Sequence, residues 1–218
     1  MIIYYAARTG TKRTLESFRR LGFGLMVSAA GVHRTEGFER YCLDNGAWTA
    51  HQQCRQWSPR PFSSMLASIG HGADFVVAPD VVACGAESLA LSLSWAPRLV
   101  DICPVYMAVQ NGHEREPGQV AQQAKTAGCV GIFVGGTTEW KERTVHLWSR
   151  VAHERGMKCH MGRVNSARRV LIAQEAGVDS MDGSGPTLYD ATRFIVARAL
   201  RQTTVFDAMR ADKWRTEP

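Results

Sequence analysis

The sequence predicts a single compact α/β domain, a (β/α)8 barrel of the TIM type, and three observations lead to this fold class. Apolar, strand-like runs alternate with helical patterns about eight times along the chain. Such alternation is typical of a parallel sheet whose strands are joined by helical crossovers. The chain has 218 residues, and the smallest such barrels have about 200. We therefore expect one domain over residues 1–218, with little room for a second.

The predicted strands are short apolar runs that recur at fairly regular intervals. They occupy residues 2–7, 23–28, 40–44, 74–79, 104–109, 131–135, 158–162 and 178–182. Eight parallel strands are the number that closes into a barrel. An open, doubly wound sheet is the alternative. A G-x-G-x-x-G pattern after the first strand would favour it, but "AARTGTKR" has a single glycine there.

The segments between these strands carry helix start and stop signals. Residues 11–22 begin with Thr and end with Gly, and residues 117–128 begin with Pro and end with Gly. Residues 86–100 have helical spacing that we expect Pro97 to interrupt near its end. Further helices are expected at residues 138–156, 165–177 and 187–200. The remaining segment, residues 201–218, is predicted to be a basic C-terminal helix or tail.

The charge balance is compatible with a polyanionic partner. The formal net charge is +6, and an excess of this kind is common in proteins that bind nucleic acid, although it is not specific for them. No apolar run has the length of a membrane span. The first residues, "MIIYYAARTG", have no basic segment before the apolar ones and do not resemble a signal peptide. We expect a cytoplasmic protein without a membrane partner.

The six cysteines indicate free thiols rather than disulfides or a metal site. They are far apart, none forms a C-x-x-C pair, and most stand in or beside apolar runs. This pattern predicts mostly buried thiols in a reducing compartment. Structural zinc usually takes close ligand pairs, so we expect no metal site.

Polar residues, glycines and one methionine stand at the C-terminal ends of most predicted strands, where barrel enzymes carry their catalytic groups. In chain order they are Asp44, Asp80, Gln110, Gly135, Gly136, Met161, Gly162, Arg163 and Asp182. We expect the three carboxylates to converge on one face, where their repulsion should spread their pKa values. A spread set can supply both an ionised nucleophile and an acid that keeps its proton.

At these residues the sequence resembles the tRNA-guanine transglycosylase superfamily. The segment "MGRVNSARRVLIAQEAGVDSMDGSGPT" is similar to the family segment that carries the catalytic nucleophile. The resemblance makes Asp182 that nucleophile. "LDNGAW" resembles the motif of the general acid/base and gives Asp44 this role, and "APDVV" resembles the segment whose aspartate, here Asp80, reads the base edge. The ordered matches span residues 40 to 187.

The same resemblance implies the remaining base contacts. "AVQNG" is similar to the family's Val-Gln-Gly, and "FVGG" to a glycine turn whose backbone contacts the base carbonyl. Trp48 and Met161 stand where the family sandwiches the flat base. The implied base-binding residues are Asn45, Trp48, Asp80, Gln110, Gly135, Gly136, Met161 and Gly162.

Two departures from the bacterial tRNA enzymes bear on the substrate. The chain lacks their Cys-x-Cys-x-x-Cys plus His zinc motif, and it has Asn45 and Ala47 where they have Ser and Gly. "NGAW" and "FVGGTTEWK" are more similar to the phage DNA-guanine transglycosylases, which insert 7-deazaguanine derivatives into DNA. The resemblance therefore implies DNA and a 7-deazaguanine base as substrates, with tRNA as the alternative and a homodimer as a possible assembly. We expect no other cofactor either, because the base exchange implied by this resemblance requires none.

Basic residues after several strands are candidates for phosphate contacts. The main candidates are Arg8, Lys12, Lys141, Arg163 and Arg168, with Arg13, Arg143 and Arg169 beside them. Residues 201–218 are either a strand-binding arm or a helix that packs on the barrel. Trp95, Trp140 and Trp148 lie in helical patterns and are expected to serve packing.

Four other interpretations of the function stay open. The one most similar to DNA base exchange is the same reaction on tRNA. A hydrolytic glycosylase would let water resolve the covalent intermediate, and a basic barrel without catalysis would only bind nucleic acid. A phosphosugar barrel enzyme would need a glycine-rich phosphate site after its last strands, which "DGSGPT" weakly resembles.

Overall fold

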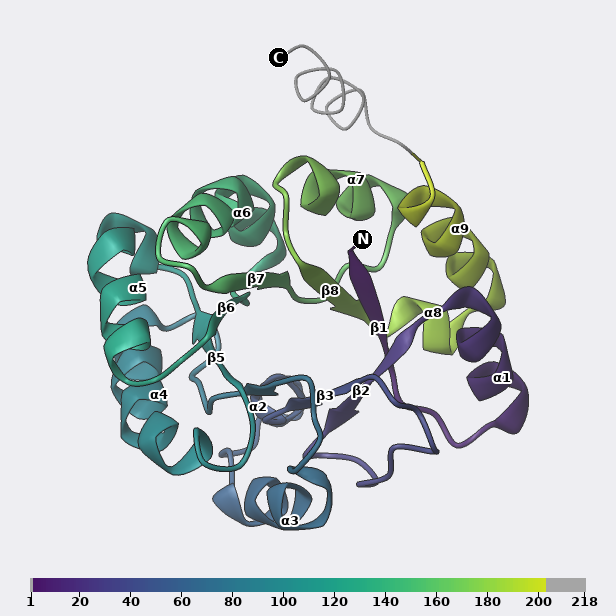
Figure 1. Cartoon of the computed structure of the whole chain (residues 1–218), viewed down its shortest axis with the longest axis horizontal. Coiled ribbons are helices and arrows are strands. Elements are labelled where there is room, and N and C mark those ends of the chain that lie inside the picture. Colours follow the sequence, from purple (N-terminus) through teal and green to yellow (C-terminus); the bar gives the residue numbers. More distant parts are fainter. Residues whose placement is uncertain (1, 203–218) are drawn as a thin grey trace, which may run out of the picture.

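The structure is a computed structural model that describes residues 2–202. In this part of the chain eight parallel strands form a closed barrel in sequence order, and helices surround it (Figure 1). β8 closes the barrel by pairing with β1, and this register places Asp182 opposite Tyr5. The predicted (β/α)8 fold is confirmed.

All eight predicted strands are present. Their bounds are β1 (Ile3–Ala7), β2 (Gly24–Ser28), β3 (Tyr41–Asp44), β4 (Val76–Val77), β5 (Val105–Val109), β6 (Gly131–Val134), β7 (Lys158–Met161) and β8 (Ser180–Gly183). β4 is much shorter than the predicted run of residues 74–79. Pro79 has no N–H to donate, so the ladder cannot extend through it.

The predicted helices are also present, with small shifts at their ends. They are α1 (Lys12–Leu21), α4 (Gly85–Leu99), α5 (Pro117–Thr126), α6 (Thr138–His153), α7 (Ala167–Glu175) and α9 (Asp190–Leu200). The expected interruption at Pro97 is wrong, because α4 continues through it. Only the final turn follows Pro97, and that turn is held by the Val100 N–H, which donates to the Ala96 carbonyl at 3.2 Å.

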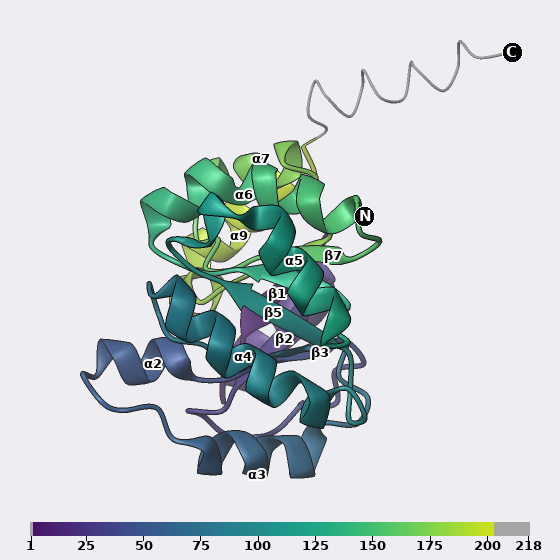
Figure 2. The same cartoon turned by 90° about the vertical axis from the view of Figure 1, so that its left-hand side faces the viewer.

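Several elements were not predicted from the sequence. These are α2 (Ala47–Gln52), α3 (Pro59–Ile69), α8 (Gly185–Leu188) and the short 3-10 helix η1 (His113–Arg115). Residues 29–40, which join β2 to β3, contain no helix. Instead this connection packs on α1, where the Arg19 guanidinium lies 4.5 Å from the centre of the Phe38 ring. Figure 2 shows α2 and α3 together at one end of the molecule.

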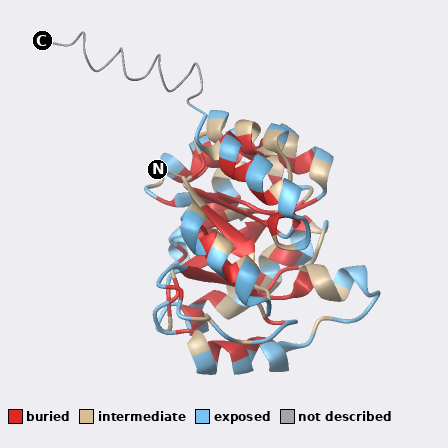
Figure 3. Cartoon of the chain, turned by 90° about the vertical axis from the view of Figure 1, so that its right-hand side faces the viewer, coloured by how far each residue is buried: buried red, intermediate tan, exposed pale blue. Residues whose placement is uncertain are grey.

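The barrel interior is filled by side chains rather than open. One cluster inside the strands includes Tyr5, Phe75 and Tyr106, and the Phe75 and Tyr106 rings stack with their centres 4.0 Å apart. Glycines make room for these rings, since a Cβ on Gly131 would lie 2.5 Å from the Tyr106 ring. A larger apolar cluster lies between the strands and the helices, and the buried strands are seen in Figure 3. The packed rings therefore leave no room for a ligand in the middle of the barrel.

Other expectations concern the thiols, the helical tryptophans and the C-terminal segment. All six cysteines are free, and four of them are buried. Trp140 and Trp148 are buried in the core and Trp95 packs partly against it, as expected. Among the helices that the structure describes, none is long and apolar enough to cross a membrane. The basic tail of residues 201–218 lies, apart from its first two residues, outside the described part of the chain.

Candidate active site

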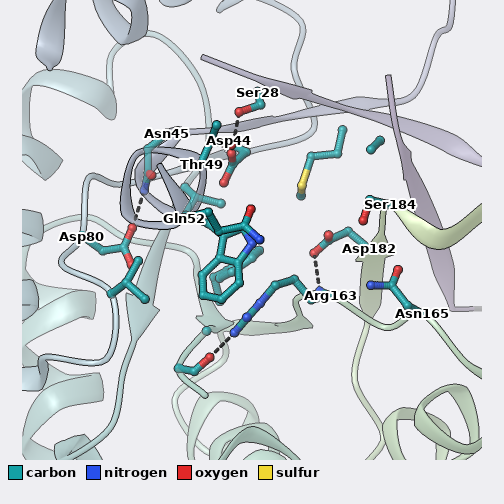
Figure 4. Close-up of a pocket in the computed structure, with 18 of the residues that line it drawn as sticks. Ser28, Asp44, Asn45, Thr49, Gln52, Asp80, Arg163, Asn165, Asp182 and Ser184 are labelled. Atoms are coloured by element: carbon teal, nitrogen blue, oxygen red, sulfur yellow. Dashed lines mark hydrogen bonds between the residues drawn. The ribbon is translucent and has the colours of Figure 1, made fainter. Parts of the chain in front are cut away.

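A pocket of about 520 Å³ opens at the C-terminal ends of the strands. This volume is in the range of roughly 300–1,000 Å³ that is usual for small-molecule sites. Polar residues from six strand ends reach it, namely Ser28, Asp44, Asp80, Gln110, Arg163 and Asp182. Met26, Val77 and Phe133 add apolar lining. The three aspartates thus surround one pocket, with Asp80 and Asp182 on opposite sides of it (Figure 4).

Alternation along each strand explains which residues reach the pocket. Successive side chains on a strand point to opposite faces, so Asp182 points inward together with Ser180, and Gly162 together with His160. The fully buried His160 contacts aromatic rings of the barrel interior, including the Phe133 ring at a centroid distance of 4.9 Å. The pocket therefore lies at the C-terminal ends of the strands, directly next to the side chains that fill the barrel.

Asp182 is held through one of its two carboxylate oxygens. Its Oδ1 lies 3.0 Å from Nε2 of His160 and 3.3 Å from the backbone N–H of Arg163, which donates to it. The other ring nitrogen of His160, Nδ1, lies 2.8 Å from the Ser180 hydroxyl. With Asp182 ionised, Nε2–H donates to Oδ1 and Nδ1 accepts from Ser180. Among the described residues, both hydrogen bonds of this carboxylate are to Oδ1, which leaves Oδ2 for a ligand.

Asp44 is anchored in the same way at the end of β3. Its Oδ2 accepts hydrogen bonds from the Ser28 hydroxyl at 2.8 Å and from the Gly46 N–H at 3.1 Å. Burial raises the pKa of Asp44 above its ordinary value, and the nearby Asp182 charge adds to this, while both hydrogen bonds oppose it. A carboxyl with a raised pKa is better suited than an ordinary one to taking up and releasing a proton during a reaction.

Asp80 and Gln110 form a fixed pair beside Asn45. The Asn45 amide donates to Asp80 Oδ1 at 2.7 Å, and the Gln110 amide donates to Oδ2 at 2.5 Å. Gln110 Oε1 accepts from the N–H groups of Ala83 and Gly136, at 3.0 and 2.8 Å. Burial raises the pKa of Asp80 to about 6, against the opposing effect of these amides. Asn45 thus supports Asp80, which leaves Asp80 as the base-reading candidate of the three.

Close packing explains the glycines of the site. A Cβ on Gly135 would lie 2.6 Å from Gln110 Nε2, and one on Gly162 would lie 2.6 Å from the Phe133 ring. Gly136 has a φ of 69°, and a Cβ on this residue would lie 2.4 Å from the Trp140 ring. Gly135 and Gly136 line the pocket, so their backbone is within reach of a ligand.

Trp48 and Arg163 form a stacked pair in the pocket. The guanidinium carbon of Arg163 lies 3.8 Å from the centre of the Trp48 ring system. The same guanidinium donates a hydrogen bond to the Gly136 carbonyl. Trp48 is half-buried and lines the pocket, as its predicted contact with a flat base requires. Arg163 was predicted to contact phosphate, but in this structure its side chain points into the pocket.

Two predicted site residues lie elsewhere. Met161 is fully buried in the apolar layer between strands and helices, so its predicted stacking on a base is wrong. Alternation along β7 turns Met161 outward, since His160 and Gly162 point inward. Lys141 is fully buried, and its Nζ donates to the Gly162 carbonyl at 2.5 Å, so the predicted phosphate contact is also wrong. Burial lowers the pKa of Lys141 to about 7.

The remaining basic candidates differ in their availability. Lys12 is exposed at the first residue of α1, on the side of the barrel where the strands end. Arg168 is exposed but bonded to Glu142, which Arg169 also contacts. Arg8 is largely covered and paired with Glu36. Lys12 and Arg168 are therefore the main predicted phosphate contacts with accessible side chains, and Arg13 and Arg143 are exposed as well.

His160, Ser180 and Ser28 were missed by the sequence analysis. A signal for the first two exists, since each stands two residues before a predicted site residue, Gly162 and Asp182, and so shares its face of the strand. Ser28 ends β2 as Asp44 ends β3, and the register pairs these two residues. Within residues 2–202, no cluster of three or more His, Cys, Asp or Glu side chains is arranged as a metal site.

Comparison with known proteins adds no assignment. No family model matches the sequence, and no curated protein matches it. The chain is a (β/α)8 barrel, a fold that usually carries enzymes with their active sites at the C-terminal ends of the strands.

Proposed function

We propose that the protein is a transglycosylase that exchanges guanine in DNA for a 7-deazaguanine derivative through a covalent bond between Asp182 and deoxyribose. One observation carries this proposal: three aspartates in different environments surround a single pocket that also holds the indole of Trp48. Fold alone does not determine a reaction, and the reaction is inferred from these side chains together with the resemblance of their motifs.

Asp182 is the nucleophile in this proposal. Its free Oδ2 attacks C1′ of the sugar as the bond from C1′ to N9 of guanine breaks, and the bonding electrons leave with the base. A carboxylate traps an oxocarbenium-like carbon in this way in retaining glycosidases. The hydrogen bonds on Oδ1 fix the rotation of the carboxylate, so Oδ2 is held in one orientation before the sugar binds.

Asp44 moves the proton that both halves of the exchange require. In its protonated form it gives a proton to the leaving guanine. The resulting carboxylate then removes the N9 proton of the incoming 7-deazaguanine, whose N9 attacks C1′ and releases Asp182. Burial raises the pKa of Asp44, which helps its carboxyl to hold the proton that the leaving guanine needs.

Base selection is assigned to Asp80, whose carboxylate Gln110 and Asn45 hold in place, and to the glycine turn. A carboxylate accepts from the N1–H and 2-amino groups of guanine. The N–H groups of Gly135 and Gly136 are donated to the Val109 carbonyl and to Gln110 Oε1, so the base carbonyl has to displace one of these acceptors to bond to the turn. Trp48 provides a flat surface for stacking. A nucleotide has to leave the duplex stack to reach such a pocket.

DNA is favoured over tRNA by the motifs "NGAW" and "FVGGTTEWK" and by the missing zinc motif. The net charge of +6 and the exposed Lys12 and Arg168 are compatible with either nucleic acid. The phosphosugar alternative is less favourable, because the Gly185 N–H in "DGSGPT" is already donated to Asn165 Oδ1 at 2.8 Å.

The test is incorporation of labelled guanine into duplex DNA or bulk tRNA. We expect label in DNA with the wild type, no label with Asp182→Asn, and wild-type incorporation with Asp101→Asn, which removes an exposed carboxylate outside the pocket. Label in tRNA alone would overturn the substrate and keep the chemistry. Base release without incorporation would indicate a hydrolytic glycosylase, and binding without either would indicate a barrel that lacks catalysis.

A further inference from the structure

The side chain of Arg163 extends across the pocket between Asp80 and Asp182 (Figure 4). Its guanidinium lies 3.8 Å from the centre of the Trp48 ring system and donates to the carbonyl of Gly136. The proposed function places the base against Trp48 and beside the glycine turn that contains Gly136. The guanidinium therefore occupies the position that a bound base would need.

The backbone of Arg163 is unusual at this point. Its φ is 57°, in the left-handed region that residues with a side chain rarely adopt. Four non-glycine residues of the described chain have a positive φ, and Arg163 is the one among them that lines the pocket. Strained conformations of this kind gather at functional sites, where the surrounding structure maintains them.

The chemistry of the guanidinium matches part of guanine. Guanine contains a guanidine unit, formed by C2 with N1, N3 and the 2-amino nitrogen, and both groups are planar with N–H donors at their edges. Arginine also stacks well on aromatic faces. Burial lowers the pKa of Arg163, and the nearby carboxylates of Asp182 and Asp80 oppose this by favouring its charged form.

We propose that Arg163 is an internal occupant of the base slot, whose guanidinium must leave Trp48 and Gly136 before guanine or a 7-deazaguanine can bind. This proposal rests on the proposed function and adds a control on base affinity to it. A base then binds only to the fraction of molecules with an open slot, and its apparent dissociation constant is raised by the inverse of that fraction.

The test compares guanine binding by the wild type, Arg163→Ala and Arg163→Lys, measured by equilibrium dialysis of labelled guanine. Both variants lack the planar group, so we expect roughly three- to thirtyfold tighter binding than in the wild type, the range that one cation–π contact implies. Arg150→Ala is the matched control, because it removes the same charge from an exposed position on α6 outside the pocket. Its affinity should equal that of the wild type.

A second measurement asks whether the emptied slot accepts a guanidinium from solution. Methylguanidinium at millimolar concentration should compete with guanine in Arg163→Ala, and should have no effect on the wild type, whose own guanidinium fills the slot. A merely structural role of Arg163 would not produce this difference. Only variants whose circular dichroism spectra match that of the wild type are compared. Arg163→Lys is included because it keeps most of the side chain and is therefore less disruptive to folding than Arg163→Ala.

The outcomes separate the two proposals. Equal or weaker guanine binding in both variants, with measurable binding in the wild type, would overturn the role of Arg163 and leave the proposed function intact. Absence of guanine binding in the wild type and in both variants would overturn the proposed base site, and the role of Arg163 with it. Tighter guanine binding by Arg163→Ala, without competition by methylguanidinium, would also overturn the proposed role of Arg163.

Discussion

At the scale of single residues, the contacts of His160 explain how Asp182 is prepared for its proposed role. His160 is fully buried, and its two ring nitrogens face Ser180 and Asp182. A buried imidazole with both nitrogens engaged has a defined tautomer and orientation. His160 is thus a positioning residue for the carboxylate rather than a group that touches the substrate.

Replacing His160 with Phe tests this role. Phe keeps the stack on Phe133 but leaves Asp182 Oδ1 without its buried donor, which costs about 1–3 kcal/mol. We expect kcat for guanine exchange to fall roughly 10- to 100-fold while KM for DNA stays near that of the wild type. His146→Gln, at an exposed position on α6, should have wild-type kinetics. A large rise in KM with an unchanged kcat would contradict the positioning role.

The pKa of Asp80 predicts how base binding depends on pH. Burial raises this pKa to about 6, so the carboxyl gains a proton as the pH falls through 6 and loses an acceptor for the N–H groups of guanine. We expect the dissociation constant of guanine to rise about tenfold per pH unit below 6. Asp80→Asn should bind guanine weakly at every pH. A flat profile in the wild type between pH 5 and 7 would contradict the assignment of Asp80 to the base.

Some residues of the candidate site could be predicted from the sequence and others could not, for a physical reason. Asp44, Asp80, Gln110 and Asp182 were found because strand ends in a parallel barrel meet at one face. The outward turn of Met161 and the burial of Lys141 depend on strand alternation and on the path of α6 across β7, which composition does not reveal. An error of one residue in a strand exchanges its two faces.

At the scale of secondary-structure elements, matched pairs of glycine and aromatic residues determine how the strands fit together. A Cβ on Gly131 would lie 2.5 Å from the Tyr106 ring, and one on Gly24 would lie 2.7 Å from the Tyr5 ring. Each glycine is on the strand next to its ring, as the β5–β6 and β1–β2 registers show. The filled floor of the pocket depends on these pairs.

The substitution Gly131→Ala should therefore destabilise the barrel. The added methyl group meets a ring inside a packed core, and overpacking of this kind costs roughly 1–3 kcal/mol. Gly10→Ala is the control, because no atom lies within 4 Å of its added Cβ. Its effect on the free energy of unfolding, measured by urea denaturation, should stay within about 0.5 kcal/mol. Equal stability of the two variants would contradict this packing.

Most strands and helices were predictable because their apolar runs and end signals agree. The exceptions depend on tertiary context. The two-residue β4 is limited by Pro79, and α2 is a six-residue helix that begins directly after the site residues of β3. Residues 29–40 contain no helix, although most barrel connections do, and their packing against α1 is not encoded in any local period.

At the scale of the whole molecule, the residues that stabilise the barrel and the residues of the candidate active site occupy different places. Packed rings fill its interior, while Asp44, Asp80 and Asp182 stand at the ends of three different strands around one pocket. This division lets a chain of 218 residues hold three buried or half-buried carboxylates near one another. The central claim for the molecule is that one of them, Asp182, becomes covalently bound to the sugar of a nucleic acid.

Trapping that covalent intermediate is the most direct test. The protein would be incubated with duplex DNA without an incoming base, denatured, and digested for peptide mass spectrometry. We predict a DNA adduct that survives denaturation, maps to Asp182, and is absent from Asp182→Asn while present in Asp101→Asn. An adduct on another residue, or guanine exchange that proceeds without any adduct, would contradict the account.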